Sequence, residues 1–291
     1  MTNDTPATPR RQGAPAPGID RTVPHSARIW NYWLGGKDNY EVDQVAGDQY
    51  AKVFPGIVDV ARAQRGFLAR SIVYLAAEAG IRQFLDVGTG LPTADNTHQV
   101  AQRVAPAARI VYVDNDPLVL AHARALLTST PQGATAYIDA DVREPGRILK
   151  EAARTLDLDR PVTVILSGIL GHIADFGEAR AIVHGLMSAL PPGSYLSLND
   201  GTNAVAPEQY GPAAAGYNGS GAIPYVLRSP GEIASFFDGL ELVEPGVVSC
   251  PRWRPCPGRG GPAADVDAFG GVGRKALNPP GRWPAGGQAG S

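Results

Sequence analysis

The stretch FLDVGTGLPTADNTHQVAQ, residues 84–102, holds two glycines, Gly88 and Gly90, directly after a short apolar run. Glycine permits a positive φ and lacks the Cβ that would keep a ligand away from the backbone amides. A glycine loop that follows a strand and opens a helix is typical of nucleotide sites. Pro92 stands where a dinucleotide site often has its third glycine. The loop therefore predicts a nucleotide site and leaves open which nucleotide it holds.

Strand-like and helix-like patterns alternate around this loop. Continuous apolar runs in the strands predict a mostly parallel sheet with helices on both faces, an α/β fold. Two late segments, 240–248 and 267–274, are expected to pair antiparallel at the sheet edge. The predicted strands are 83–87, 109–113, 135–138, 161–166 and 194–198, and the predicted helices are 64–79, 97–104, 117–127, 145–156 and 177–189.

Composition excludes several classes of function. The chain has 291 residues and a net charge of −2 without a basic run, so neither nucleic acid nor an acidic membrane surface is expected as a partner. The absence of an apolar run of membrane-spanning length predicts a cytoplasmic protein. Two cysteines, Cys250 and Cys256, are too few for a four-thiolate metal site; free thiols and no metal are expected. Residues 1–24 and 276–291, rich in Pro and in Thr or Gly, are expected to be disordered around one domain of residues 25–275.

Polar residues follow each predicted strand at its carboxyl end, which is the edge where open α/β sheets bind ligands. Asp114 lies 24 positions after Gly90, where a carboxylate can accept both ribose hydroxyls. Asp141 falls where an adenine would lie, with the Val142 amide as a donor to the ring. The strand-end residues are Asp86, Gly88 and Gly90, then Asp114, Asn115 and Asp116, then Asp141, then Ser167 and Gly168, then Asn199, Asp200 and Thr202.

The charges of the loop decide between two ligands. A pyrophosphate needs a loop that runs straight into a helix N-terminus, and a carboxylate there would repel it. Asp86 and Asp95 flank the loop around Pro92. S-adenosylmethionine carries a sulfonium and an ammonium, so acidic residues would attract it. These residues favour S-adenosylmethionine, while an NAD-dependent oxidoreductase remains the weaker alternative.

Several long motifs resemble an actinobacterial family of S-adenosylmethionine-dependent methyltransferases, methyltransferase family 19. The resemblance runs from about residue 24 to residue 275, and Pro92 matches the family's own proline loop. The motifs are PHSARIWNYWLGGKDNYEVDQ, FLDVGTGLPTADNTHQVAQ, ARIVYVDNDPLVLAHARALL, ADVREPGRIL, LPPGSYLSL and FGGVGRK.

The resemblance implies the class I methyltransferase fold, a Rossmann-like sheet of seven strands whose last pair is antiparallel. It also implies cofactor roles by position. The methionine part would pass Gly88 and Gly90 with its ammonium on Asp86, the ribose would bind Asp114 beside Asn115, adenine would bind Asp141 and Val142, and Ser167 and Gly168 would line the sulfonium side.

The sequence differs in two places from the residues usual in the family. Gln64 stands where relatives usually have Asn, and Asn199-Asp200 stands where they usually have Ser-His. Both places could face the substrate. The second difference keeps open a non-catalytic S-adenosylmethionine-binding protein as an alternative to an enzyme.

The aromatic segment 26–44 is expected to form an amphipathic helix that packs Ile29, Trp30, Trp33 and Leu34 on the core. Together with the resemblance, its remaining polar and aromatic residues suggest a lid over the cofactor within residues 25–60. In this hypothesis Tyr40 or Tyr32 covers the methyl site, and Arg65 or Arg28 pairs with the cofactor carboxylate.

Methyl transfer to a small-molecule acceptor is an in-line displacement that depends chiefly on alignment and exclusion of water. A general base is needed only when the acceptor must lose a proton early. His172 is the first candidate for this base and Asp200 the second. A structural role for His172, with its ring nitrogens satisfied by the fold, is an equal alternative.

Overall fold

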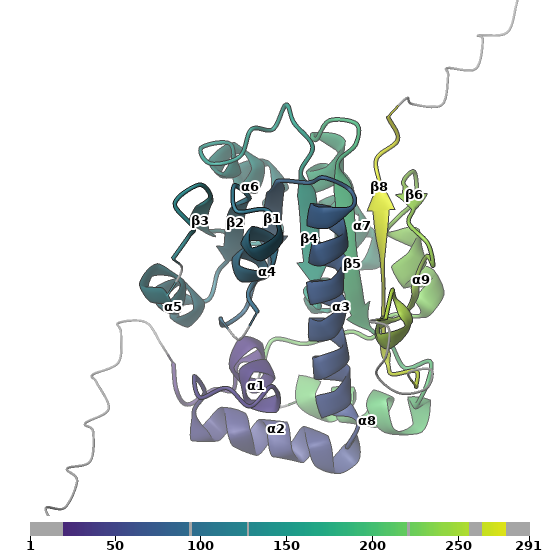
Figure 1. Ribbon diagram of the computed structural model, residues 1–291. Coiled ribbons are helices and arrows are strands. Elements are labelled where there is room, and N and C mark those ends of the chain that lie inside the picture. Colours follow the sequence, from purple (N-terminus) through teal and green to yellow (C-terminus); the bar gives the residue numbers. More distant parts are fainter. Residues whose placement is uncertain (1–19, 93–94, 127, 220–221, 256–263, 278–291) are drawn as a thin grey trace, which may run out of the picture.

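A computed structural model describes residues 20–92, 95–126, 128–219, 222–255 and 264–277 (Figure 1). Its centre is one sheet in the order β3-β2-β1-β4-β5-β8-β6, and β7 also pairs with β8. The strands are β1 Gln83–Val87, β2 Arg109–Asp114, β3 Ala134–Asp139, β4 Thr163–Ser167, β5 Tyr195–Gly201, β6 Glu241–Leu242, β7 Val248–Ser249 and β8 Ala268–Arg274.

Helices cover both faces of this sheet. The α-helices are α1 Ser26–Trp33, α2 Glu41–Val53, α3 Ile57–Ala77, α4 Thr97–Val104, α5 Pro117–Leu126, α6 Pro145–Ala152, α7 Phe176–Ser188, α8 Pro207–Asn218 and α9 Pro230–Ser235; the 3₁₀ helices are η1 Leu170–His172 and η2 Cys250–Arg252. Every predicted helix and each of the five predicted parallel strands is present, and α2, α8 and α9 are additional.

The first five strands run parallel and β8 runs antiparallel to β5, as predicted for the edge of a class I methyltransferase sheet. The sheet has eight strands and not seven, because two short strands, β6 and β7, occupy the edge where one was expected. Between them lie Pro245, which has no N–H for the ladder, and Gly246, which has a φ of 83°. The predicted edge strand is therefore divided into β6 and β7.

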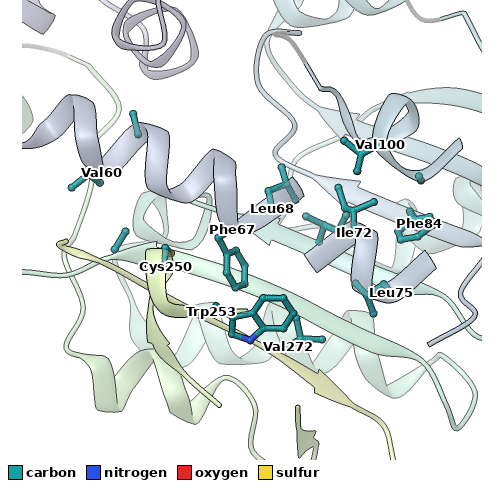
Figure 2. Close-up of a cluster of buried hydrophobic side chains, with 14 of the residues drawn as sticks. Val60, Phe67, Leu68, Ile72, Leu75, Phe84, Val100, Cys250, Trp253 and Val272 are labelled. Atoms are coloured by element: carbon teal, nitrogen blue, oxygen red, sulfur yellow. The ribbon is translucent and has the colours of Figure 1, made fainter. Parts of the chain in front are cut away.

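Side-chain alternation along the strands divides the core into two halves. Phe84 of β1 packs with α3 and α4 on one face, while Leu85 faces the other half of the core with α6 and α7. Figure 2 shows Phe67 of the long helix α3 beside Trp253, and their ring centroids are 5.4 Å apart. Cys250, a buried free thiol, lies in the same cluster. Cys256 lies outside the described residues.

Helices α1, α2 and α8 gather at the end of the sheet toward which the parallel strands point (Figure 1). The predicted amphipathic helix is α1, which buries Ile29 and Trp33 and is followed by Gly35 at a φ of 78°. Phe54, after α2, stacks on Tyr210 of α8 with 4.5 Å between ring centroids. These three helices therefore close the carboxyl end of the sheet.

The ends of the chain lie largely outside the described residues, which include only 20–24 of the predicted N-terminal arm and only 276–277 of the predicted tail. Residues 20–23 contact the domain, because the Arg28 guanidinium donates to the carbonyls of Asp20 and Val23. No helix in the described part of the chain is long and apolar enough to cross a membrane.

Candidate active site

A cavity at the carboxyl ends of β1, β2 and β4 brings most of the predicted site residues together. Its other walls come from α1, α2, α3, η1, α8 and the segment 223–225. The predicted residues that line it are Arg65, Asp86, Gly88, Gly90, Asp114, Asn115, Asp141, Val142, Ser167, Gly168 and His172. The predicted residues Tyr40 and Asp200 do not.

The glycine loop begins where β1 ends, and its two glycines have different surroundings. Gly88 has a φ of 76°, and a Cβ at this position would lie 2.5 Å from the Ile169 side chain. Gly90 has a φ of 66° and open space at the same place, and it lines the cavity. Packing therefore requires the first glycine, while the second leaves the loop backbone open to a ligand.

Asp86 lies at the floor of the cavity with 4% of its surface exposed. Thr97 at the start of α4 donates its hydroxyl to Asp86 Oδ2 at 2.6 Å. Burial raises the pKa of Asp86 to about 6, against the opposing effects of the Thr97 hydrogen bond and the Arg65 charge. A cationic group beside this carboxylate would favour its charged form.

Asp114 fixes the far side of the glycine loop. Its Oδ2 accepts the Gly90 N–H at 2.8 Å, and its Oδ1 accepts the N–H groups of Asn115 and Asp116 at 2.9 and 3.0 Å. Burial raises the pKa of Asp114 despite these bonds. Asn115 reaches toward Asp141, with 3.4 Å between Asn115 Nδ2 and Asp141 Oδ2. Three strand ends thus present polar groups along one edge of the cavity.

Ser167 and Gly168 follow β4 on the next side of the cavity. Ser167 Oγ accepts a hydrogen bond from Asn199 Nδ2 at 2.9 Å, and Gly168 has a φ of 70°. Gln64 of α3 lies beside Gly168 with 3% of its surface exposed. Its buried Nε2 makes no hydrogen bond within the described part of the chain, which leaves a donor in the cavity wall for a ligand.

His172 ends η1 and lines the cavity between the Ser167 side and the segment 223–225. Its Nδ1 donates to the Pro224 carbonyl at 3.0 Å, because a carbonyl can only accept. In neutral His172 this bond leaves the lone pair on Nε2. Burial lowers the pKa of His172, so the neutral form dominates at pH 7.

Asp200 was predicted as a second base, but the fold encloses it. β5 extends to Gly201, so Asp200 is a strand residue with none of its surface exposed. Its Oδ1 accepts the Tyr225 hydroxyl and the Gly201 N–H, and Arg228 Nη1 lies 3.8 Å from Oδ2. Asp200 therefore lies behind the cavity wall, where it holds Tyr225.

The predicted lid tyrosines and Arg28 have structural partners instead of facing the cavity. Tyr40 is the N-cap residue of α2, and the guanidinium carbons of Arg21 and Arg28 lie 4.5 and 5.2 Å from its ring centroid. Tyr32 donates to Asp48 near the surface, and buried Arg28 pairs with Asp43. The sequence pattern identified α1 correctly but misplaced these polar residues.

Asp95, expected among the charges for a cationic ligand, also points elsewhere. Its carboxylate pairs with Arg103 of α4, and its backbone carbonyl accepts the Arg65 guanidinium at 2.9 Å. Asp95 therefore contributes by placing Arg65, which itself lines the cavity.

An aromatic wall, largely missed in the sequence, closes the side of the cavity opposite the strand ends. Two of its tyrosines stand seven positions apart in α8, a helical spacing that could have revealed a shared face. Tyr225, in a segment without regular periodicity, gave no such signal. The wall consists of Trp30, Trp33, Leu34, Tyr50, Tyr210, Tyr217 and Tyr225.

Within the described residues, no group of three or more His, Cys, Asp and Glu side chains could hold a metal ion. Of the two places expected to differ from the family, Gln64 lines the cavity and Asn199-Asp200 does not.

Comparisons with known proteins agree with this geometry. The family model described as S-adenosyl methyltransferase matches residues 12–276. A crystal structure of a DUF574 family protein from Streptomyces avermitilis shares 45% identity and a TM-score of 0.84, over 88% of this chain and 99% of that one. A candidate methyltransferase from Thermobifida fusca shares 41% identity and a TM-score of 0.81, over 89% and 98% of the two chains. No curated protein matches the chain. The chain belongs to the S-adenosyl methyltransferase family and is an S-adenosylmethionine-dependent methyltransferase.

Proposed function

We propose that this methyltransferase acts on a small, largely apolar acceptor held between the glycine loop and the aromatic wall. One observation carries the proposal: a single cavity is lined both by the polar strand ends and by the aromatic side chains of α1 and α8. A cofactor on the strand ends would leave the aromatic side for the molecule that receives the methyl group. The location of the protein in the cytoplasm remains a prediction from the sequence.

The residues of the strand ends fit S-adenosylmethionine. Three acidic side chains face a ligand with two positive groups, and the space at Gly90 lets a ligand approach the loop. When bound, this cofactor supplies a methyl group on a positively charged sulfur. We assign its ammonium to Asp86, its carboxylate to Arg65, its ribose to Asp114 and Asn115, its adenine to Asp141 and Val142, its methionine chain to Gly88 and Gly90, and its sulfonium side to Ser167.

His172 is the proposed general base. The bond from its Nδ1 to Pro224 orients the ring, and its lowered pKa keeps Nε2 free to take a proton at neutral pH. The Tyr225 ring packs edge-on at 5.0 Å between centroids and supports this orientation. An acceptor hydroxyl or amine that must lose its proton would place that proton on Nε2.

The aromatic wall argues for a planar or apolar acceptor. Trp30, Tyr50 and Tyr217 offer large apolar faces whose contact with a ring is favourable beyond simple area burial. The buried amide of Gln64 adds one donor, which suits an acceptor molecule with an oxygen near the reacting atom. A hydroxylated aromatic compound satisfies both conditions.

Titration calorimetry and a methyl-transfer assay test the proposal. S-adenosylhomocysteine should bind and NAD should not; the reverse result would contradict the cofactor assignment. In a panel of hydroxylated aromatic acceptors, His172→Gln should lower turnover by about 10²–10⁴-fold with unchanged cofactor affinity. His184→Gln, an exposed histidine of α7, is the matched control. Cofactor binding without turnover on any acceptor would favour a non-catalytic binding protein.

A further inference from the structure

A second cavity lies at the amino ends of the parallel strands, at the opposite end of the sheet from the proposed active site. Gln83, Arg109 and Tyr195 line it at the first residues of β1, β2 and β5, and Arg274 lines it at the last residue of antiparallel β8. The segment 153–161 between α6 and β4 forms another wall. Nothing in methyl transfer uses this cavity.

The charge of this cavity is strongly unbalanced. Its wall holds one carboxylate, Asp157, and five guanidinium groups, those of Arg82, Arg109, Arg154, Arg160 and Arg274. The whole chain has a net charge of −2. A positive field is therefore concentrated at one concave site of a slightly acidic protein, which would attract anions to it.

The fold uses only part of the donor capacity of these arginines. Arg82 donates to the carbonyls of Ala76 and Ile81, and Arg109 donates to that of Thr155. The other three guanidinium groups make no hydrogen bond or ion pair with any residue that the structure describes. Most other arginines on the described surface are paired with carboxylates, as Arg180 is with Asp238.

We infer that this second cavity binds a small anion with two or more phosphoryl groups. The planar guanidinium fork matches phosphate oxygens, and several forks around one concavity suit several adjacent charges. S-adenosylmethionine is excluded as the occupant, because its two positive groups would meet five guanidinium groups. An extended nucleic acid would need a stripe of basic residues along the surface. The concave arrangement favours a compact ligand.

Titration of the full-length protein with pyrophosphate in a phosphate-free buffer at low ionic strength tests this inference. Pyrophosphate should bind, and saturating S-adenosylhomocysteine should not displace it. Arg154→Gln combined with Arg160→Gln should weaken binding by at least about tenfold, since the loss of one charge-assisted hydrogen bond alone is worth that factor. Both side chains are exposed, and unchanged affinity of the variant for S-adenosylhomocysteine verifies its fold.

Arg180→Gln, which removes a guanidinium outside the cavity, should bind pyrophosphate as the unaltered protein does. ATP and adenosine separate the possible sources of the phosphoryl groups: ATP should bind, and adenosine should not compete with pyrophosphate. Absence of pyrophosphate binding, equal weakening by Arg180→Gln, or displacement by S-adenosylhomocysteine would each overturn the inference. Because pyrophosphate is tested without an acceptor, its failure leaves the proposed methyl transfer intact.

Discussion

Alanine substitutions at Gly88 and Gly90 should have different consequences, although both glycines belong to one loop and both have a positive φ. A left-handed conformation costs a residue with a Cβ about 1–2 kcal/mol. At Gly90 the added methyl enters open space, so only this backbone cost applies. At Gly88 the methyl would lie 2.5–2.7 Å from Ile169, and overpacking adds about 1–3 kcal/mol. Gly88→Ala should therefore lower the free energy of unfolding by about 2–5 kcal/mol, and Gly90→Ala by about 1–2 kcal/mol.

Urea denaturation of both variants measures these free energies of unfolding, and calorimetry with S-adenosylhomocysteine measures the second effect. Gly90→Ala should weaken the binding of S-adenosylhomocysteine more than its small loss of stability implies, because the methyl would occupy open space at a residue that lines the cavity. Ile169→Ala supplies the control for Gly88. It removes two of the three nearest atoms, so the double variant should recover part of the packing cost.

Equal losses of stability in the two variants would refute the assignment of different roles to the two glycines. Additive losses in the double variant of Gly88 and Ile169 would also refute it, because atoms in direct contact should couple. Full affinity of Gly90→Ala for S-adenosylhomocysteine would show that the ligand does not approach this part of the loop.

Three further predictions concern the polar groups of the cavity. Burial raises the pKa of Asp86 from about 4 to about 6. Between these two pH values the carboxyl of Asp86 is protonated in the folded protein and ionised in the unfolded chain. Lowering the pH through this window should therefore raise the Asp86 contribution to the free energy of unfolding and weaken binding of the cofactor ammonium; Asp86→Asn should flatten both profiles, measured by denaturation and calorimetry. Tyr225→Phe should cost about 1–3 kcal/mol in urea denaturation, since buried Asp200 loses its phenol donor, and an unchanged midpoint and slope would contradict this role. Asp114→Asn should weaken the binding of S-adenosylhomocysteine at least about tenfold in calorimetry. Equal affinity of the variant and the unaltered protein would contradict the assignment of the ribose to Asp114.

Periodicity predicted the sheet and its covering helices because buried strands and amphipathic helices leave clear local patterns. Gln83–Val87 and Thr97–Val104 have the predicted bounds. The sequence analysis missed helix α8 because Pro212, a residue that disfavours the helix interior, lies inside it and its sequence is rich in Ala and Gly. Helix α3 begins at Ile57, seven residues before the predicted start, where no Ser, Thr, Asp or Asn cap precedes it.

The sequence predicted the site residues that lie at strand ends, and it did not predict those whose place depends on tertiary contacts. Strand-end residues such as Asp86 and Asp114 follow from topology, because parallel strands end at one edge. Tyr40 and Arg28 are of residue types that often bind cofactors, so the sequence alone could not show that they have structural partners instead. Only the fold shows that Arg28 is committed to Asp43.

The pair Asn199-Asp200, where the sequence was expected to differ from the family, lies behind the aromatic wall of the cavity. A buried carboxylate is costly unless it is paired, and Asp200 has Arg228 and Tyr225 as partners. Arg228 also donates to the carbonyls of Leu170 and Ile173, which flank His172. The buried pair of Asp200 and Arg228 thus connects β5 both with Tyr225 and with the segment that carries His172. Substitution of Asp200 would change the site by moving these two groups, without any contact between Asp200 and the ligand.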